Sequence, residues 1–197
     1  MNRRLVIFLV AGAGLVSGLA ALALSLGTRH EEVRVVGHPA VPAFVLLIGW
    51  SFIASGLVGW WRRPASRFGV LLAAAGFAWF AAELTAANAP VWFSIGLLIT
   101  PIWIAVFFHA LLSFPSGRLE LTAARVVVGL FYLEVTVVQL AWFLFADLPQ
   151  LLGCSTCPEN VFLLADRPRV SNAVLLVQQP IIAVLLLAGG IGVMVHR

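Results

Sequence analysis

The chain has 197 residues, of which 62% are hydrophobic and only 10% are charged. A soluble domain has roughly a quarter charged residues, so this composition excludes a water-soluble fold. The net charge is +4, but the basic residues stand singly or in pairs at the ends of apolar stretches. That placement is typical of membrane boundaries and argues against nucleic acid as a partner. Lysine is absent, which excludes a P-loop lysine and a Schiff-base lysine.

Six apolar stretches predict an all-α, polytopic membrane protein, because each stretch is long enough to cross a hydrocarbon core of roughly 30 Å. The first stretch follows Arg3 and Arg4 and contains Ala21 and Ala23, as a signal peptide would. Its length of about 22 residues exceeds the roughly 7–15 apolar residues of a signal peptide and favours a retained helix. We predict one transmembrane domain, residues 1–197, with helices at about 5–26, 41–61, 68–84, 91–114, 123–145 and 172–195.

The arginines predict which side of the membrane each loop occupies, because short cytoplasmic loops are enriched in basic residues. With the N-terminus inside, the inner side holds Arg3, Arg4, Arg62, Arg63, Arg67, Arg118, Arg125 and Arg197, and the outer side holds Arg29, Arg34, Arg167 and Arg169. This bias predicts that both termini are cytoplasmic. We expect the protein to lie in the plasma membrane of a bacterial cell.

Two predicted cytoplasmic loops have distinctive sequences, WWRRPASRFG at residues 60–69 and FHALLSFPSGRL at residues 108–119. Pro64 and Pro115 end the helices, and Gly117 permits a tight turn. Together the two strings resemble the N-terminal membrane region of actinobacterial sensor histidine kinases. In that family an Arg-Pro-x-Asn-x-x-Gly loop and a His-x-Leu-x-x-Phe-Pro-x-Gly-Arg segment recur at about this separation. Ser66 stands where the family usually has Asn, and the resemblance covers residues 60–119 only.

The resemblance implies a membrane module that passes a signal to a cytoplasmic helix with a phospho-accepting histidine and then to an ATP-binding domain. It also implies a homodimer, and a response regulator as a partner that is reached only through the kinase domains. Neither kinase element occurs in the sequence, which has no Asp-x-Gly-x-Gly string and only His196 as a histidine in a cytoplasmic segment. We therefore expect a truncated or isolated sensor region without kinase activity of its own.

Templates for other enzymes do not fit. The string His30-Glu31-Glu32-Val33-Arg34 lacks the second histidine of a zincin helix, and Gly-x-Ser-x-Gly and Gly-x-Gly-x-x-Gly are absent. We predict no catalytic residue, no cofactor and no metal ligand.

Polar side chains inside the helices are candidates for a ligand or signal site, because an ionisable group at the bilayer centre costs roughly 2.5–3.5 kcal/mol and needs partners. One hypothesis is an internal ligand, proton or quinone-like site formed by Glu134, Gln178 and Gln179. Pro101 and Pro180 would then act as hinges. The alternative is that these residues only hold the helices together by hydrogen bonds. Near the same depth we place Thr100, Ser51 and Ser17.

His109 lies on the fourth predicted helix, near its cytoplasmic end. We therefore expect it to lie closer to the cytoplasmic surface than Glu134 does on the fifth. It either packs and forms hydrogen bonds locally or acts as a haem or metal ligand. Small residues at Gly14 and Gly18, and at Ser51, Ser55 and Gly59, predict close helix packing, within one bundle or in a homodimer.

Cys154 and Cys157 lie in the longest outer loop, where the compartment is oxidising under the predicted topology. A structural disulfide, a redox pair and a Cys2His2 metal site completed by His30 and His38 are the alternatives.

The resemblance thus implies that this membrane protein is the sensor region of a two-component histidine kinase in the lipid bilayer. A transporter subunit would instead require inverted repeats, which the two halves do not display. A small structural or assembly membrane protein is the third class.

Overall fold

The computed structural model describes residues 2–29, 41–147 and 154–195, with the side chains at 186 and 189–195 excepted. Throughout these residues the regular structure is helical, and six spans are long and apolar enough to cross a membrane. The prediction of an all-α, multi-pass membrane protein is confirmed. The spans are α1 (Arg3–Gly27), α3 (Val41–Arg62), α4 with η1 (Phe68–Ala82 and Glu83–Ala86), α5 with α6 (Pro90–Ile99 and Ile102–Leu112), α7 with η2 and α8 (Thr122–Leu133, Glu134–Val138 and Gln139–Phe143), and α10 (Pro168–Val195).

Local sequence explains several helix ends. Asn2 caps α1, because its side chain accepts a hydrogen bond from the Arg4 N–H at 3.2 Å. Helix α10 begins at Pro168, earlier than the predicted residue 172, since a proline is well suited to the first helical turn. The 3-10 turn η1 extends the third span to Ala86.

Two of the six spans are irregular near their middle. The fourth is interrupted at Thr100–Pro101, where α5 ends and α6 begins, as a proline that lacks an N–H and crowds the preceding turn would cause. The fifth contains η2, a π-helical segment between α7 and α8. The sequence predicts hinges at Pro101 and Pro180. The span is interrupted at Pro101, whereas α10 continues through Pro180. The π-helical segment is not predicted by the sequence.

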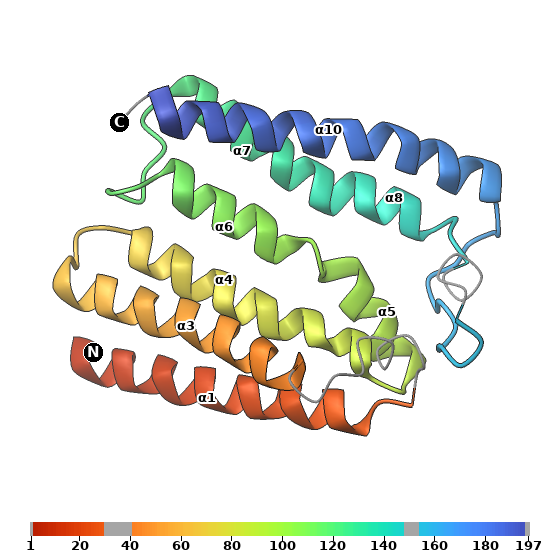
Figure 1. Cartoon of the computed structure of the whole chain (residues 1–197), viewed down its shortest axis with the longest axis horizontal. Coiled ribbons are helices and arrows are strands. Elements are labelled where there is room, and N and C mark those ends of the chain that lie inside the picture. Colours follow the sequence, from red (N-terminus) through yellow and green to blue (C-terminus); the bar gives the residue numbers. More distant parts are fainter. Residues whose placement is uncertain (1, 30–40, 148–153, 196–197) are drawn as a thin grey trace.

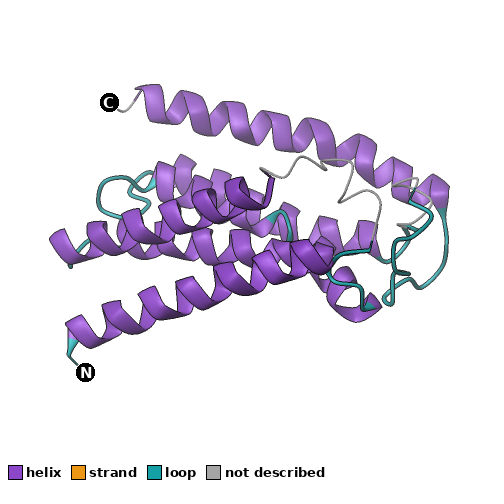
Figure 2. Cartoon of the chain, turned by 60° about the horizontal axis from the view of Figure 1, so that its bottom comes forward, coloured by secondary structure: helices purple, strands orange, loops and turns teal. Residues whose placement is uncertain are grey.

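The spans form an elongated bundle in which neighbours along the chain mostly pack together (Figures 1 and 2). Helix α3 packs between α1 and α4, and α4 packs on α6. Beyond α6 lie α7, α8 and α10. Helix α1 begins at the same end of the bundle at which α10 ends (Figure 1).

Glycines let α3 and α4 approach each other closely. A Cβ atom at Gly69 would lie 2.5 Å from the Gly56 carbonyl oxygen, and one at Gly76 would lie 2.7 Å from the Gly49 carbonyl oxygen. These are backbone contacts that cannot move aside, so both positions require glycine.

The Gly14 and Gly18 pair packs within the chain. The Trp50 indole of α3 lies over it and donates a hydrogen bond from Nε1 to the Gly14 carbonyl at 3.1 Å. Ser51 and Ser55, by contrast, are exposed and face away from the bundle.

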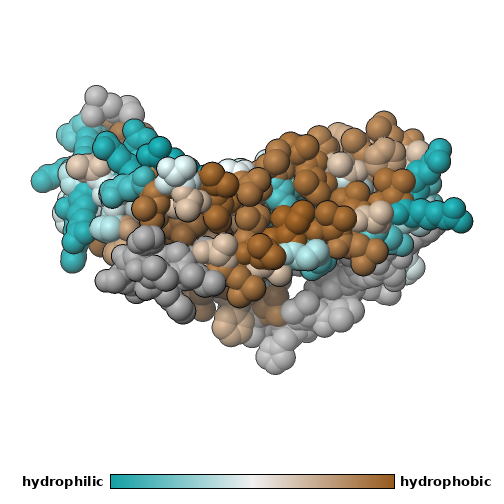
Figure 3. All heavy atoms as spheres, turned by 90° about the horizontal axis from the view of Figure 1, so that it is seen from above, coloured by the Kyte–Doolittle hydropathy of each residue, from teal (hydrophilic) through white to brown (hydrophobic). Residues whose placement is uncertain are grey.

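A band of hydrophobic side chains crosses the middle of the molecule, and hydrophilic residues gather at both ends (Figure 3). Large apolar side chains such as Phe8, Leu176 and Leu187 are 66–76% exposed. In water such a surface would aggregate, whereas lipid solvates it.

The α3–α4 contact generates a prediction. Gly69→Ala should destabilise the protein by about 1–3 kcal/mol, because the new methyl group overpacks a backbone contact. Gly12→Ala is the matched control, since a Cβ there has nothing within 4 Å. Thermal unfolding in detergent, followed by circular dichroism, compares the variants. Equal melting temperatures for the two variants would contradict the close packing of α3 on α4.

Candidate functional site

Glu134 is an ionisable residue enclosed between the helices. Its side chain is only 2% exposed, and it stands at the first position of η2. The Gln178 side chain lies beside it. However, neither carboxyl oxygen has a donor with hydrogen-bonding geometry in the described part of the chain. The carboxyl is therefore buried with an incomplete set of partners.

The π-helical segment separates Glu134 from a second polar residue, Gln139, and Gln178 lies beside the first and bonds the second. At α-helical spacing of 100° per residue, Gln139 would point about 140° away from Glu134. In η2 the Gln139 N–H instead reaches the carbonyl of Glu134, five residues earlier. This wider turn changes the angle between the two residues. Gln139 thus joins the polar group.

Gln139 links three spans through its side chain. Its Oε1 accepts a hydrogen bond from Gln178 Nε2 of α10 at 3.1 Å, and its Nε2 donates to the Leu97 carbonyl of α5 at 3.5 Å. Leu97 lies four residues before Pro101, so its carbonyl has lost the helical donor that the proline cannot supply. A side chain from the π-helical span therefore compensates the break in the neighbouring span.

The other polar residues that the sequence places with Glu134 or near its depth do not join this group. Gln179 is exposed, on a different face of α10 from the buried Gln178. Ser17 is half-buried and Ser51 is exposed, and each donates to a carbonyl of its own helix, Ala13 and Ile48 respectively. Thr100 likewise donates to Gly96 of its own span. The polar chain consists of Glu134, Gln178, Gln139 and the Leu97 carbonyl.

No arginine compensates the carboxyl from the helices packed around it. The arginines of α7 and α10, Arg125 and Arg169, stand nine residues before Glu134 and Gln178 respectively, which is about 13 Å along a helix axis. Burying an unpaired carboxylate costs on the order of several kcal/mol. The arrangement is therefore suited to holding a proton or a small cation.

His109 lies in the interface between α6 and α7. Its Nδ1 is 3.3 Å from the Tyr132 hydroxyl, and its carbonyl accepts a hydrogen bond from Ser113 Oγ at 2.7 Å. Phe108 stacks on Phe131 in the same interface, with ring centroids 5.4 Å apart. His109 therefore connects the span of Glu134 to the end of α6.

The two loops that carry the family resemblance contact each other. Ser66 Oγ donates to the Pro115 carbonyl at 2.7 Å, and the Arg67 N–H donates to the Ser116 carbonyl at 3.0 Å. Gly117 has a φ of +74°, and a Cβ atom there would lie 2.2 Å from the Phe68 nitrogen. Only glycine fits this position. We call these contacts the loop clamp.

Cys154 and Cys157 form a disulfide in the loop at the opposite end. Their sulfurs are therefore not available as thiolate metal ligands. His30 and His38, the predicted partners in a metal site, lie outside the described residues. Asn160 fixes the same loop, because its Nδ2 donates to the Phe143 and Ala146 carbonyls at 2.7 and 3.2 Å.

No family model, curated protein or solved structure matches this chain. Its own residues and their geometry are therefore the basis for proposing a function.

Adjacent glutamines provide a test of the polar chain. Gln178→Leu should lower stability by roughly 1 kcal/mol, because it removes the hydrogen bond to Gln139. Gln179→Leu should be neutral or stabilising, since that side chain faces lipid. Unfolding by a denaturing detergent, measured on both variants, gives the difference. A larger loss for Gln179→Leu would contradict this assignment.

Proposed function

We propose that this chain is the membrane-embedded signal-input region of a two-component sensor histidine kinase in a bacterial plasma membrane. The observation that carries the proposal is the loop clamp. The resemblance rests on two strings far apart in the sequence, and these strings meet through the Ser66–Pro115 and Arg67–Ser116 hydrogen bonds. Residues that contact each other in one structural unit restrict each other's sequence. Two helix ends that do not meet would have no such restriction.

The departure at Ser66 is compatible with this reading. The Ser66 hydroxyl is a donor to the Pro115 carbonyl, and a side-chain amide at this position also carries a donor. Gly117 fits as well, because the turn requires a residue that tolerates positive φ and close backbone contact.

The buried polar chain is the input element in this proposal. Glu134 lies at the π-helical segment and next to the span that breaks at Pro101, and such helix irregularities often mark hinges. A change in the occupancy of the carboxyl would shift α7 and α10. From α7 the shift reaches α6 through Tyr132 and His109, and α6 ends at the loop clamp.

The orientation follows from the arginine bias. The clamp lies on the cytoplasmic side, and the disulfide loop lies outside. The proposal includes a homodimer and a response regulator that is engaged through kinase domains.

Single cysteines test the orientation, since both native cysteines are joined and unreactive to maleimide. Ala65→Cys lies in the loop clamp region and Asp166→Cys near the disulfide loop, and both positions are exposed. In intact cells a membrane-impermeant maleimide should label Asp166→Cys, and Ala65→Cys only after permeabilisation. The reverse pattern would invert the proposed topology.

The kinase assignment is tested by the native coding sequence that follows Arg197. We expect it to continue into a helix with a phospho-accepting histidine and an ATP-binding domain. A stop codon there, with no kinase encoded alongside, would contradict the proposal. If the kinase domains are present, Glu134→Gln should change autophosphorylation, while Glu83→Gln, a carboxyl paired with Ser25 at 3.0 Å, serves as the control.

A second candidate is a transporter subunit, which the broken fourth span favours. Interrupted helices beside a buried carboxyl are typical of substrate or ion sites in secondary transporters. Proteoliposomes separate the two candidates. Proton or cation flux that Glu134→Gln abolishes would favour transport over sensing.

A further inference from the structure

A cleft of about 390 Å³ opens between the first turns of α1 and the last turn of α3. It is lined by Arg4, Ile7, Phe8 and Trp61. The three residues from α1 have the spacing i, i+3 and i+4, so they share one helix face opposite the indole. The volume falls within the range of small-molecule sites.

The cleft has a charged end and an apolar end. Arg4 stands in the first turn of a membrane-spanning helix, and Phe8 lies four residues deeper, which is about 6 Å along the axis. Phe8 is 74% exposed and Trp61 is 66% exposed. The cationic end therefore lies at headgroup depth, and aromatic walls follow at the depth of the acyl chains.

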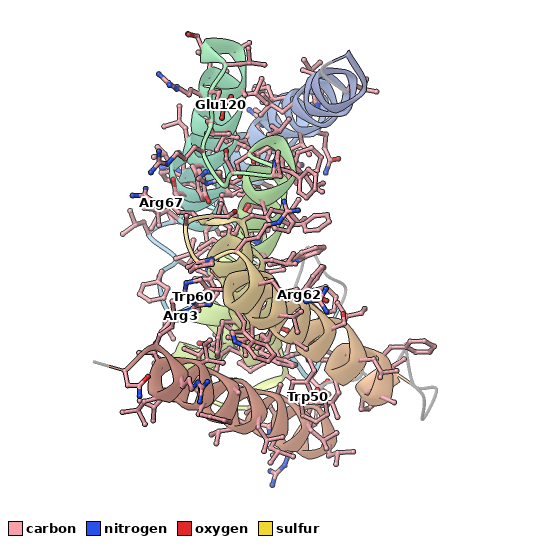
Figure 4. The ribbon with its side chains drawn as sticks, turned by 90° about the vertical axis from the view of Figure 1, so that its left-hand side faces the viewer. Arg3, Trp50, Trp60, Arg62, Arg67 and Glu120 are labelled. Atoms are coloured by element: carbon pink, nitrogen blue, oxygen red, sulfur yellow. A yellow bond between two sulfur atoms is a disulfide. The ribbon has the colours of Figure 1, made fainter. Side chains whose placement is uncertain are left out.

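The neighbouring arginine has a different task. The Arg3 guanidinium donates to the Trp60 carbonyl at 2.9 Å and also to the Trp61 carbonyl, so it ties α1 to the end of α3 (Figure 4). Arg4 is exposed, and no side-chain hydrogen bond or ion pair of it occurs within the described structure. Arg3 thus holds the walls of the cleft together, and Arg4 is available to a ligand.

Charge at this end of the bundle defines the ligand. Arg62 and Arg63 follow Trp61 directly, and Arg67 lies in the next turn. The acidic residue described at this end is Glu120, which lies far from Arg3 in Figure 4 and is 3.5 Å from the Ser116 hydroxyl. Among the described residues no carboxylate lies beside the cleft to pair with an ammonium headgroup, whereas a headgroup with net negative charge is complementary to the arginines.

We propose that this cleft binds an anionic phospholipid. Arg4 holds the phosphate by charge-assisted hydrogen bonds, and Ile7, Phe8 and Trp61 hold the upper part of the acyl chains. The site is independent of the proposed kinase function. Trp61, which lines the cleft, is in the last turn of α3, just before the loop clamp. A bound lipid would therefore influence the position of this helix end.

Native mass spectrometry tests the site on protein released from nanodiscs with equal amounts of phosphatidylglycerol and phosphatidylcholine. The wild-type chain should retain phosphatidylglycerol preferentially. Arg4→Gln should reduce retention about tenfold, the cost of one charged hydrogen bond. Arg118→Gln is the matched control, because it removes the same charge at the same end without lining the cleft. Equal losses for the two variants would overturn the site and leave only general charge attraction.

Two further measurements test the acyl-chain contact and the chemical nature of the ligand. Phe8→Ala, at an exposed position, should also lower retention, and no effect would overturn the acyl-chain contact. Excess inorganic phosphate should not displace the lipid, and displacement would assign the cleft to free phosphate. The same spectra report the oligomeric state. A wild-type dimer that Arg4→Gln converts to monomer would assign the cleft to a second copy.

Discussion

Backbone carbonyls and amides that a helix leaves unpaired must find partners inside the protein when lipid is the solvent. Side chains meet this need at several places where a described span is interrupted or ends. Gln139 donates to Leu97 beside the Pro101 break, and Arg3 donates to the last turn of α3. Asn160 does the same for the end of α8. These bonds fix which helices stand next to each other, because each donor comes from a different span or loop than its acceptor.

The bundle has two parts, α1, α3 and α4 on the one hand and α6, α7, α8 and α10 on the other, and their helices pack through different kinds of contact. In α1, α3 and α4 the contacts depend on glycines and on indoles that bind carbonyls, as Trp50 does at Gly14 and Trp79 at Val45. Backbone contacts of this kind tolerate little adjustment. In α6, α7, α8 and α10 the contacts are stacked rings and amide side chains around a π-helical segment. Rings and amides permit alternative arrangements, so conformational change is expected in the second part.

The sequence was sufficient for the spans but not for the polar chain. Apolar length predicted six helices, since a hydrocarbon core sets the length of any span. Proline chemistry predicted the irregularity at Pro101. The part that Gln139 takes could not be predicted, because its direction depends on a π-helical turn that no residue type specifies. Gln178 and Gln179 were equivalent in the sequence, and only the rotation of α10 distinguishes a buried amide from one that faces lipid.

The loop clamp gains its importance from where the two parts of the bundle meet. Of α1, α3 and α4, helix α4 has the most extensive packing on α5 and α6, and Phe52 of α3 adds a ring contact with Phe107 of α6. The clamp fastens the turn before α4 to the turn after α6, at the end of that contact. A shift of α6 along or about its axis must therefore either move the start of α4 or break the Ser66 and Arg67 hydrogen bonds. The backbone at Gly117 is packed closely against the Phe68 nitrogen. A movement of the start of α4 together with α6 is therefore favoured over rupture of the hydrogen bonds. A change near Glu134 would then be felt at the end of the bundle where the arginines gather.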